Sequence, residues 1–234
     1  MRLMTWNCRV GAFRRKAGKV APMRPDILVV QEVEPLKPGV IFDGDRQPTF
    51  ADRVADPAYP RRAIGVFSYT GLELRAEDTA DPMYCFRRYA AVHTSGPFQV
   101  VAVWTAKTTE RATSYRQAHE GLRRHADWIR QHPTVVLGDF NASASYDGKA
   151  WAELLRLTEG LDLVSAYHHV TGEPFGAEKQ WTHFHKGDEG SKWHIDYCFV
   201  PRAWVPKITK VEVGAYAEWR TNSDHVPLTV DLDL

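Results

Sequence analysis

Polar side chains that could do chemistry recur in this sequence at one kind of position, at or just past the end of a short apolar run. Glu32 follows the aliphatic run Ile27–Val30, and Asp139 and Asn141 follow the run Thr134–Leu137. A carboxylate this close to buried aliphatic residues is costly unless a cation or a hydrogen-bond donor compensates it. The residues that share this setting are Asn7, Glu32, Asp139, Asn141, Asp196, Asp224 and His225.

Two kinds of chemistry suit these residue types. Carboxylate and amide oxygens, such as those of Glu32 and Asn7, are ligands for hard cations such as Mg²⁺ or Mn²⁺. Asp139 and Asn141 point the same way if their segment is extended, and together they could orient a water molecule and donate to a developing negative charge. His225, if a carboxylate holds it, keeps a fixed tautomer and a positive charge that suits a phosphate.

Each of these patterns taken alone also has an ordinary explanation. Glu32 could be an exposed strand end, Asn7 a turn residue, and the tetrapeptide GDFN a loop rich in Asp and Asn. His225 could be a structural histidine. Asp196 alternates with apolar residues, and a charge that points inward at such a position demands compensation.

The elements that must position these residues are mainly short strands. Strands are predicted at 3–6, 27–30, 134–137, 163–166, 181–183, 195–200, 208–213 and 227–232, with a short one near 40–42 inside a loop region at 35–59. Hairpins are predicted at 63–68 with 72–77 and at 89–94 with 98–106, helices at 13–23, 110–131 and 151–157, and a polar loop at 184–192. Many strands with few helices favour one domain over residues 1–234, with stacked sheets covered by helices.

Composition places the chain among ordinary globular proteins. It has 234 residues, of which 44% are hydrophobic and 25% charged. Thirty basic residues balance 29 acidic ones, so net charge gives no signature of a nucleic-acid or membrane partner, although a local basic rim would suffice for nucleic acid. Three cysteines form no disulfide or zinc pattern. Because no signal peptide or membrane-spanning run is present, we expect a soluble, cytoplasmic protein without membrane insertion.

Five segments, in this order, resemble the endonuclease/exonuclease/phosphatase superfamily, which includes AP endonucleases and pancreatic-type deoxyribonuclease. These segments are TWN at Thr5–Asn7, PDILVVQE at Pro25–Glu32, GDFN at Gly138–Asn141, HIDYCFV at His194–Val200 and SDHVPL at Ser223–Leu228. They run from the first predicted strand to the last. The resemblance implies an α/β fold, a four-layered sandwich of two mixed β-sheets packed face to face and flanked by helices.

The resemblance also implies a role for each residue of the set. Asn7 and Glu32 match the residues that bind the metal ion, and Asp224 matches one that can assist. The ion is expected to be Mg²⁺ or Mn²⁺. Asp139 matches the residue that aligns or deprotonates the attacking water. Asn141 matches the partner that steadies the transition state, and Asp196 the one that orients the catalytic histidine, here His225.

This sequence departs from the family pattern at two places. Some members carry an acidic residue where this chain has Arg9, which puts an auxiliary carboxylate there in doubt. Many members have a histidine or tyrosine near the end of the central strand, where this chain reads VWTAK. Thr105 or Lys107 could take over that contact with phosphate.

The substrate is expected to be DNA or RNA, cleaved by a nuclease. Residues that could contact it are Arg88, Thr105, Lys107 and Trp193, although arginines of this kind are also common on solvated surfaces and tryptophans in cores. A hydrolase of a small or lipid phosphoester is the second hypothesis. A non-catalytic binding protein on the same fold is the third, and the oligomeric state stays open.

Overall fold

A computed structural model describes residues 1–35, 47–55, 63–69, 71–77, 86–105 and 114–234. Within these residues, two six-stranded sheets form the body of the molecule. The first has the strand order β13-β14-β1-β2-β4-β3, in which β1 and β2 run parallel and the other neighbours antiparallel. Its strands are β1 (Arg2–Asn7), β2 (Ile27–Gln31), β3 (Phe50–Ala55), β4 (Ala63–Ser68), β13 (Ile208–Val213) and β14 (Leu228–Leu232).

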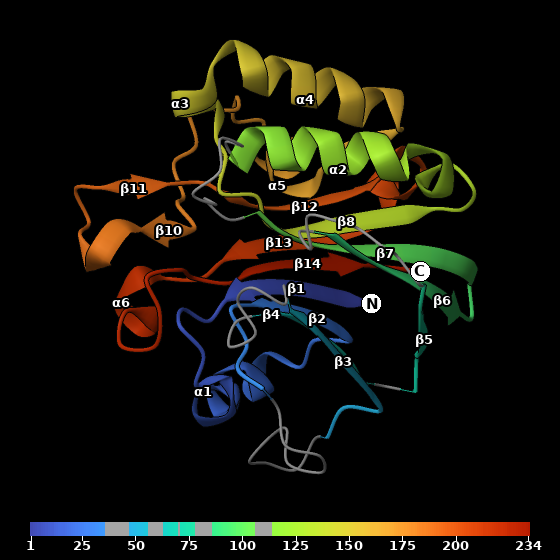
Figure 1. The fold of residues 1–234 in the computed structure, drawn as a ribbon, viewed down its shortest axis with the longest axis horizontal. Coiled ribbons are helices and arrows are strands. Elements are labelled where there is room, and N and C mark those ends of the chain that lie inside the picture. Colours follow the sequence, from blue (N-terminus) through green and yellow to red (C-terminus); the bar gives the residue numbers. More distant parts are fainter. Residues whose placement is uncertain (36–46, 56–62, 70, 78–85, 106–113) are drawn as a thin grey trace.

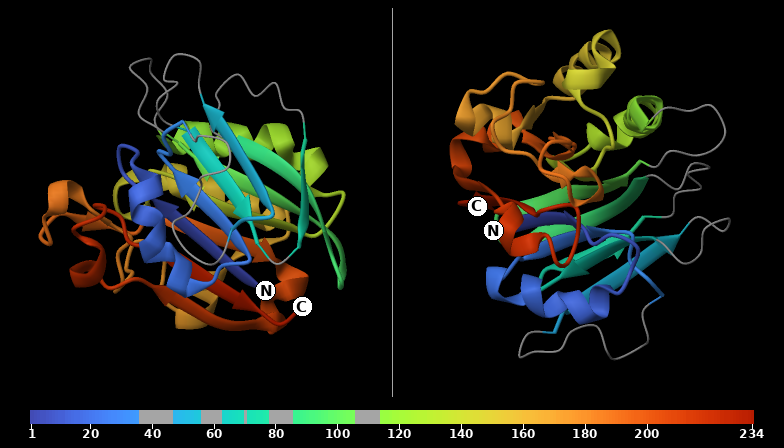
Figure 2. Two further views of the ribbon diagram at one scale, coloured as in Figure 1. Left: turned by 90° about the horizontal axis from the view of Figure 1, so that it is seen from below. Right: turned by 90° about the vertical axis from the view of Figure 1, so that its left-hand side faces the viewer.

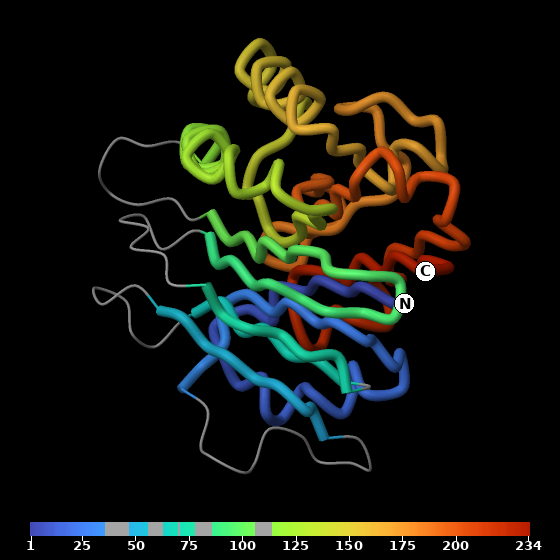
Figure 3. The backbone as a smooth tube through the Cα atoms, turned by 90° about the vertical axis from the view of Figure 1, so that its right-hand side faces the viewer, coloured from blue at the N-terminus to red at the C-terminus, as the bar shows by residue number. Residues whose placement is uncertain are grey.

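The second sheet has the order β5-β6-β7-β8-β12-β9, with β7 and β8 parallel and the rest antiparallel. Its strands are β5 (Glu73–Ala76), β6 (Phe86–His93), β7 (Gly96–Trp104), β8 (Thr134–Asp139), β9 (Leu163–Ser165) and β12 (Asp196–Pro201). In the first sheet, by contrast, the two ends of the chain meet, because β1 pairs with β14 and the termini lie close together (Figure 3).

Helices cover the outer face of each sheet, which gives four layers (Figures 1 and 2). Helix α1 (Phe13–Val20) packs on the first sheet, while α2 (Ser114–Ile129) and α4 (Lys149–Gly160) pack on the second. Successive strand residues point to opposite faces, so Leu3 lies between the sheets and Met4 lies under α1. The apolar runs are continuous because both faces of their strands are covered. The predicted four-layered α/β sandwich is confirmed.

Short elements complete the chain. They are η1 (Ala21–Met23), α3 (Ala144–Asp147), α5 (Ala166–Thr171), η2 (His185–Gly187), η3 (Arg202–Lys207) and α6 (Tyr216–Trp219). Strands β10 (His183–Phe184) and β11 (Lys192–Trp193) pair as a small separate hairpin (Figure 1). Among the described residues, no helix is long and apolar enough to cross a membrane.

The predicted hairpin of residues 63–68 and 72–77 is wrong, because the two strands belong to different sheets. β4 pairs with β2 and β3, whereas β5 pairs with β6. Ser68 Oγ donates a hydrogen bond to the Leu72 carbonyl at 2.8 Å, and Leu72 and Leu74 are buried between the sheets. The chain passes from the first sheet to the second here because that path buries both leucines in the core between the sheets.

Other boundaries also differ from the prediction. Residues 50–55, predicted as loop, form β3, which pairs with β4 along its whole length. The predicted strand 163–166 ends at Ser165, because α5 begins at Ala166. The predicted strand near 40–42 and the start of the predicted helix 110–131 lie outside the described residues.

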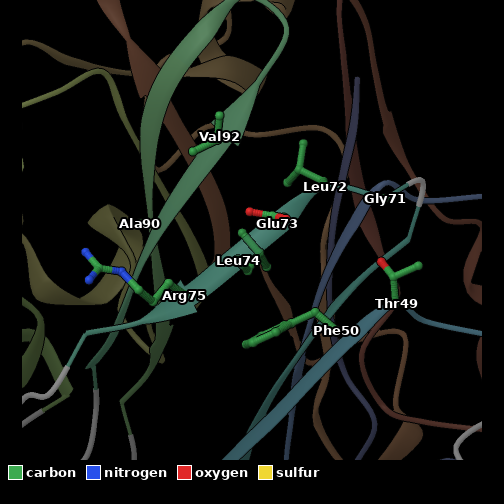
Figure 4. Close-up of a pocket in the computed structure, with 9 residues that line it drawn as sticks. All are labelled: Thr49, Phe50, Gly71, Leu72, Glu73, Leu74, Arg75, Ala90 and Val92. Atoms are coloured by element: carbon green, nitrogen blue, oxygen red, sulfur yellow. The ribbon is translucent and has the colours of Figure 1, made fainter.

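A hollow lies between the edge strands β3 and β5 (Figure 4). Its walls include Phe50, Leu74 and Val92. Phe50 pairs with Ser68, at the end of β4 away from Glu32, and Val92 pairs with Pro97, near the start of β7. The hollow therefore lies at the opposite end of the strands from Asp139, apart from the cluster of predicted site residues.

Candidate active site

The two sheets bring the predicted site residues to one rim of the sandwich. Asn7 ends β1 and Glu32 directly follows β2, its parallel neighbour, so both lie at the same edge of the first sheet. Asp139 ends β8 in the second sheet. Asp196 begins β12 and lies directly opposite Asp139 in the antiparallel ladder. His225 precedes β14 and contacts both aspartates.

Asp139 is held by a network of amide donors. Asn7 Nδ2 and Asn141 Nδ2 each donate to Asp139 Oδ2 at 2.9 Å, and the Asn141 backbone N–H donates to Oδ1 at 2.8 Å. Asn7 Nδ2 also lies 3.4 Å from Glu32 Oε1. Asn141 Nδ2 donates in addition to the Thr105 carbonyl at 2.6 Å. Asp139 therefore has a fixed orientation, and both amide groups serve to position it.

His225 forms a dyad with Asp196. Its Nδ1 lies 2.9 Å from Asp196 Oδ2, which fixes the tautomer, and its Nε2 lies 4.0 Å from Asp139 Oδ2. Asp196 is itself positioned through its backbone, because its N–H donates to Thr182 Oγ1 at 3.0 Å. The imidazole thus lies between two carboxylates, one hydrogen-bonded and one facing its free edge.

The loop that carries His225 is fastened to the first strand. Ser223 Oγ donates to the Asn7 carbonyl at 2.7 Å and accepts from the His225 backbone N–H at 3.0 Å. Trp6 Nε1 donates to the His225 carbonyl at 3.0 Å. These bonds join the ends of β1 and β14 and thereby set the position of His225 relative to Asn7.

Two residues of the cluster, and the glycine before Asp139, have unusual backbone conformations. Glu32 has φ 63° and Asn141 has φ 44°, in the left-handed region that costs most residues free energy. Gly138 has φ 150°, and a Cβ atom there would lie 1.9 Å from the Val103 carbonyl oxygen. Only glycine permits this close approach of β7 to β8, directly before Asp139.

Burial and charge determine the protonation of the cluster. Burial and the nearby charge of Asp196 raise the pKa of Asp139, against the opposing effects of His225, Asn7 and Asn141. Burial alone would lower the pKa of His225, but the charge of Asp196 and its hydrogen bond raise that pKa to about 9. At neutral pH His225 is therefore a cation with one N–H committed to Asp196, and the carboxyl group of Asp139 has a raised proton affinity.

The donor set fits a hard divalent ion. Glu32, Asp139, Asp196 and Asp224 offer carboxylate oxygens, and Asp196 Oδ1 is buried without a hydrogen-bond partner in the described part of the chain. A protonated imidazole cannot coordinate, so His225 in its charged form leaves oxygen ligands, which Mg²⁺ and Mn²⁺ prefer. Asn7 presents its amide nitrogen to the carboxylates, and its Oδ1 accepts from the Arg9 N–H at 2.9 Å. Any metal contact of Asn7 must therefore use the second lone pair of that oxygen.

The predicted substrate contacts have different settings. Trp193 lies beside the site, stacked on His183 with ring centroids 5.8 Å apart. Thr105 is fully buried and its hydroxyl donates to the Phe140 carbonyl, so it lies behind Asn141 rather than in a substrate's path. Arg88 lies over the Trp128 ring of α2 at 5.0 Å. Lys107 lies outside the described residues.

Sequence reasoning missed three residues of the cluster. His183 forms an isolated bridge with His225, and their ring centroids are 4.4 Å apart. Thr182 Oγ1 accepts hydrogen bonds from the backbone N–H groups of Ile195 and Asp196. Ser223 links the loop before β14 to the end of β1. Ser223 could have been suspected from its place in the SDHVPL segment, whereas Thr182 and His183 follow no pattern that marks a site.

The fold is that of a class of protein, the α/β sandwich hydrolases that act on phosphoesters. The chain belongs to the endonuclease/exonuclease/phosphatase family, whose model matches residues 4–225. It is accordingly a hydrolytic enzyme of a family of metal-dependent nucleases and phosphatases.

Individual relatives are distant. Recombination repair protein 1 of Drosophila melanogaster is 28% identical over 113 residues, which are 42% of this chain and only 16% of that protein. The Neisseria 3′ phosphatase NExo, solved with a product DNA hairpin, aligns over the whole of both chains with a TM-score of 0.70 and 22% identity. The AP endonuclease LMAP of Leishmania major aligns over all of this chain and 87% of its own, with a TM-score of 0.73 and 13% identity. At these identities the structural likenesses establish the fold.

Proposed function

We propose that the chain is a divalent-metal-dependent nuclease that hydrolyses phosphodiester bonds in nucleic acid, with DNA the favoured substrate. The observation that carries this proposal is the pairing of Asp139 and His225, whose Oδ2 and Nε2 atoms lie 4.0 Å apart at the rim of the sandwich. A carboxylate base and an imidazolium acid at this separation can act on the same phosphoryl group.

Asp139 serves as the base in this mechanism. It accepts a hydrogen bond from the attacking water and takes its proton as the water oxygen bonds to phosphorus. Asn7 and Asn141 hold the carboxylate in one orientation, and burial raises its pKa, which brings its proton affinity nearer to that required at neutral pH. Asn141 therefore acts mainly as a positioning residue for Asp139.

His225 serves as the electrostatic partner. Asp196 keeps its Nδ1 occupied, so the Nε2–H is the group that can donate to a phosphoryl oxygen. As the pentavalent transition state gathers negative charge, this donor stabilises it more than the ground state. The bond from phosphorus to the leaving oxygen then breaks, and that oxygen takes up a proton from solvent, so the products are an alcohol and a phosphate group.

Glu32 would hold the divalent ion, together with Asn7 through Oδ1 and with Asp224. When bound, the ion supplies positive charge that offsets the repulsion between an anionic phosphoester and its nucleophile. The chain's own contribution is to keep Glu32 in place, since the Val10 backbone N–H donates to Glu32 Oε2 at 2.6 Å.

A nucleic-acid substrate is supported by two observations. Trp193, stacked on His183 beside His225, offers a ring on which a base or sugar can pack. NExo was solved with a DNA hairpin, and the Drosophila relative is named for recombination repair. The phosphatase activity in the name of NExo makes a phosphomonoester at a DNA 3′ end the second candidate substrate.

The test is a comparison of substrates and ions. The purified chain is incubated with Mg²⁺, Mn²⁺ or EDTA and with plasmid DNA, abasic DNA, a 3′-phosphorylated duplex, RNA and chromogenic phosphoesters. The proposal predicts cleavage of DNA that EDTA abolishes. Turnover of monoesters alone would favour the phosphatase, and DNA binding without turnover would favour a non-catalytic protein.

A further inference from the structure

We propose that His183, Asp224 and His225 form a second cation site, selective for nitrogen-preferring divalent ions such as Zn²⁺ or Co²⁺, and that its occupation inhibits the enzyme. Each of the three residues offers a ligand atom, and these atoms lie within 4.8 Å of one another. The site shares Asp224 with the oxygen donor set around Glu32 and His225 with the reacting centre, and it differs from both in the nitrogen ligand of His183.

His183 is the residue that makes this site possible. Strand β10 places it against His225 in an antiparallel bridge, with ring centroids 4.4 Å apart. Its Nδ1 is buried, and no hydrogen-bond partner for it exists in the described part of the chain. A buried imidazole nitrogen without a partner is unusual, because buried polar atoms are generally satisfied. A metal ion bound to this nitrogen would satisfy it.

The ligand types determine which ions fit. Two imidazole nitrogens with one carboxylate oxygen form a set common to Zn²⁺ and other transition-metal sites, where three protein ligands leave a position for water. Mg²⁺ prefers oxygen ligands and keeps several waters. The same rim can therefore hold Mg²⁺ at its carboxylates while discriminating against it at His183.

Occupation of this site would disable His225. The ion replaces the proton on one ring nitrogen of His225, and that proton is released to solvent. Because Nδ1 is committed to Asp196, the nitrogen available is the one that would otherwise donate to a phosphoryl oxygen. The imidazole can then no longer act as a donor there. This consequence rests on the proposed function, whereas binding of the ion does not.

Arg9 opposes the ion. Its Nε lies 3.3 Å from Asp224 Oδ2, so the guanidinium already pairs with one of the three ligands. An incoming cation must share Asp224 with Arg9 or displace it. Removal of the Arg9 charge should therefore tighten binding, which gives a variant with an effect opposite in sign to loss of a ligand.

The test measures binding directly, by the absorption spectrum of bound Co²⁺ and by calorimetry of Zn²⁺ binding, and therefore needs no enzymatic assay. Both measurements use the full chain in excess Mg²⁺. His183→Phe keeps a ring to stack on Trp193 but removes the nitrogen ligand. His185→Ala is the matched control, because His185 is exposed and belongs to neither candidate ligand group. Circular dichroism checks that each variant is folded.

We expect one Co²⁺ equivalent in the wild type, unchanged in His185→Ala and weakened at least about tenfold in His183→Phe. Arg9→Gln should bind about two- to fivefold more tightly. If the enzyme turns over substrate, the Zn²⁺ concentration that halves each variant's own rate should shift by the same factors. Co²⁺ binding in His183→Phe equal to that of the wild type, or no binding in the wild type, would overturn the proposal without bearing on the nuclease hypothesis.

Discussion

Asp139 and Asp196 lie directly opposite each other on the antiparallel strands β8 and β12, and neither is exposed to solvent. Asp196 accepts the hydrogen bond from His225 Nδ1, while Asp139 faces Nε2 of the same ring. One imidazole therefore lies between two buried carboxylates. In the proposed mechanism Asp196 fixes and charges the histidine, and Asp139 stays available on the reacting side.

Loss of the Asp196 charge should change the pH dependence of activity. The pKa of His225 is raised to about 9, so its active, protonated form persists up to that pH in the wild type. In Asp196→Asn the two largest effects that raise this pKa are lost and only the charges of Asp139 and Asp224 still oppose burial, so the alkaline limb of the profile of kcat against pH should move to lower pH. The rate at pH 8 should fall by on the order of 10²-fold.

The check is a pH series of kcat for both proteins. The control is Asp162→Asn. This aspartate has an exposed side chain paired with Arg202, which follows the end of β12 opposite to Asp196. An alkaline limb at the same pH in Asp196→Asn and the wild type would contradict this account of His225.

Removal of the Ser223 hydroxyl should loosen the loop that carries His225. Ser223→Ala leaves the Asn7 carbonyl and the His225 N–H without this partner inside a buried region, at a cost of about 1–3 kcal/mol of unfolding free energy. Displacement of His225 should also reduce kcat by about tenfold or more. Chemical denaturation and steady-state kinetics measure the two effects.

An exposed hydroxyl provides the comparison. Thr209 Oγ1 donates to the Asp231 carbonyl at 3.3 Å on the surface, and Thr209→Ala should change stability by less than about 0.5 kcal/mol. If Ser223→Ala matched Thr209→Ala in both measurements, Ser223 would have no positioning role.

Gly138→Ala should be severely destabilising. The added Cβ would lie 1.9 Å from the Val103 carbonyl oxygen, which belongs to backbone and cannot swing away, and φ 150° strains any other residue. Together these effects should cost about 3–5 kcal/mol. Gly18→Ala is the matched control, because Gly18 lies in α1 with nothing within 4 Å, and alanine should stabilise that helix by about 0.5–1 kcal/mol. Thermal denaturation of both variants checks the contrast, and equal melting temperatures would contradict it.

His194 should make the protein sensitive to acid. The residue is buried, its Nδ1 pairs with the Gln180 carbonyl at 2.9 Å, and burial lowers its pKa from 6.5 to about 4. Because the unfolded chain binds the proton more readily, this stabilisation is complete above pH 6.5 and is lost as the pH falls towards 4. The loss amounts to about 3 kcal/mol.

His194→Asn isolates this contribution, because the asparagine amide can still donate to Gln180 but does not titrate. The variant starts less stable, since it loses the ring packed on Tyr167, yet its unfolding free energy should fall less steeply between pH 6.5 and 4. His183, whose pKa burial lowers to about 3, contributes with the same sign in both proteins. Equal slopes in urea denaturation across this range would count against the prediction.

The convergence of Asn7, Glu32 and Asp139 was predictable because each ends or follows an apolar run that is typical of a buried strand. Glu32 after Ile27–Val30 and Asp139 after Thr134–Leu137 are positions that local pattern alone can mark. Which strands pair with each other, in contrast, could not be predicted from local pattern. The segment 63–77 has a turn in its middle, yet whether its strands pair with each other depends on the core that Leu72 and Leu74 enter.

Contacts between residues far apart in the sequence could not be predicted from local pattern either. His183 reaches His225 only because β10 crosses the rim, and Thr182 serves Asp196 for the same reason. The position of Thr105 directly after its strand predicts a contact with phosphate. Its complete burial follows from β7 lying in the middle of the second sheet, a fact of topology rather than of local pattern.

The most direct test of the account is a double-mutant cycle on kcat with Asp139→Asn, His225→Gln and the double variant, measured at saturating Mg²⁺ on whichever phosphoester the wild type cleaves. If the two residues act as one unit, each single variant should lose on the order of 10²- to 10³-fold, and the double variant should be little slower than the slower single one. Single variants that turn over at nearly the wild-type rate, or losses that multiply fully in the double variant, would contradict a shared reacting centre.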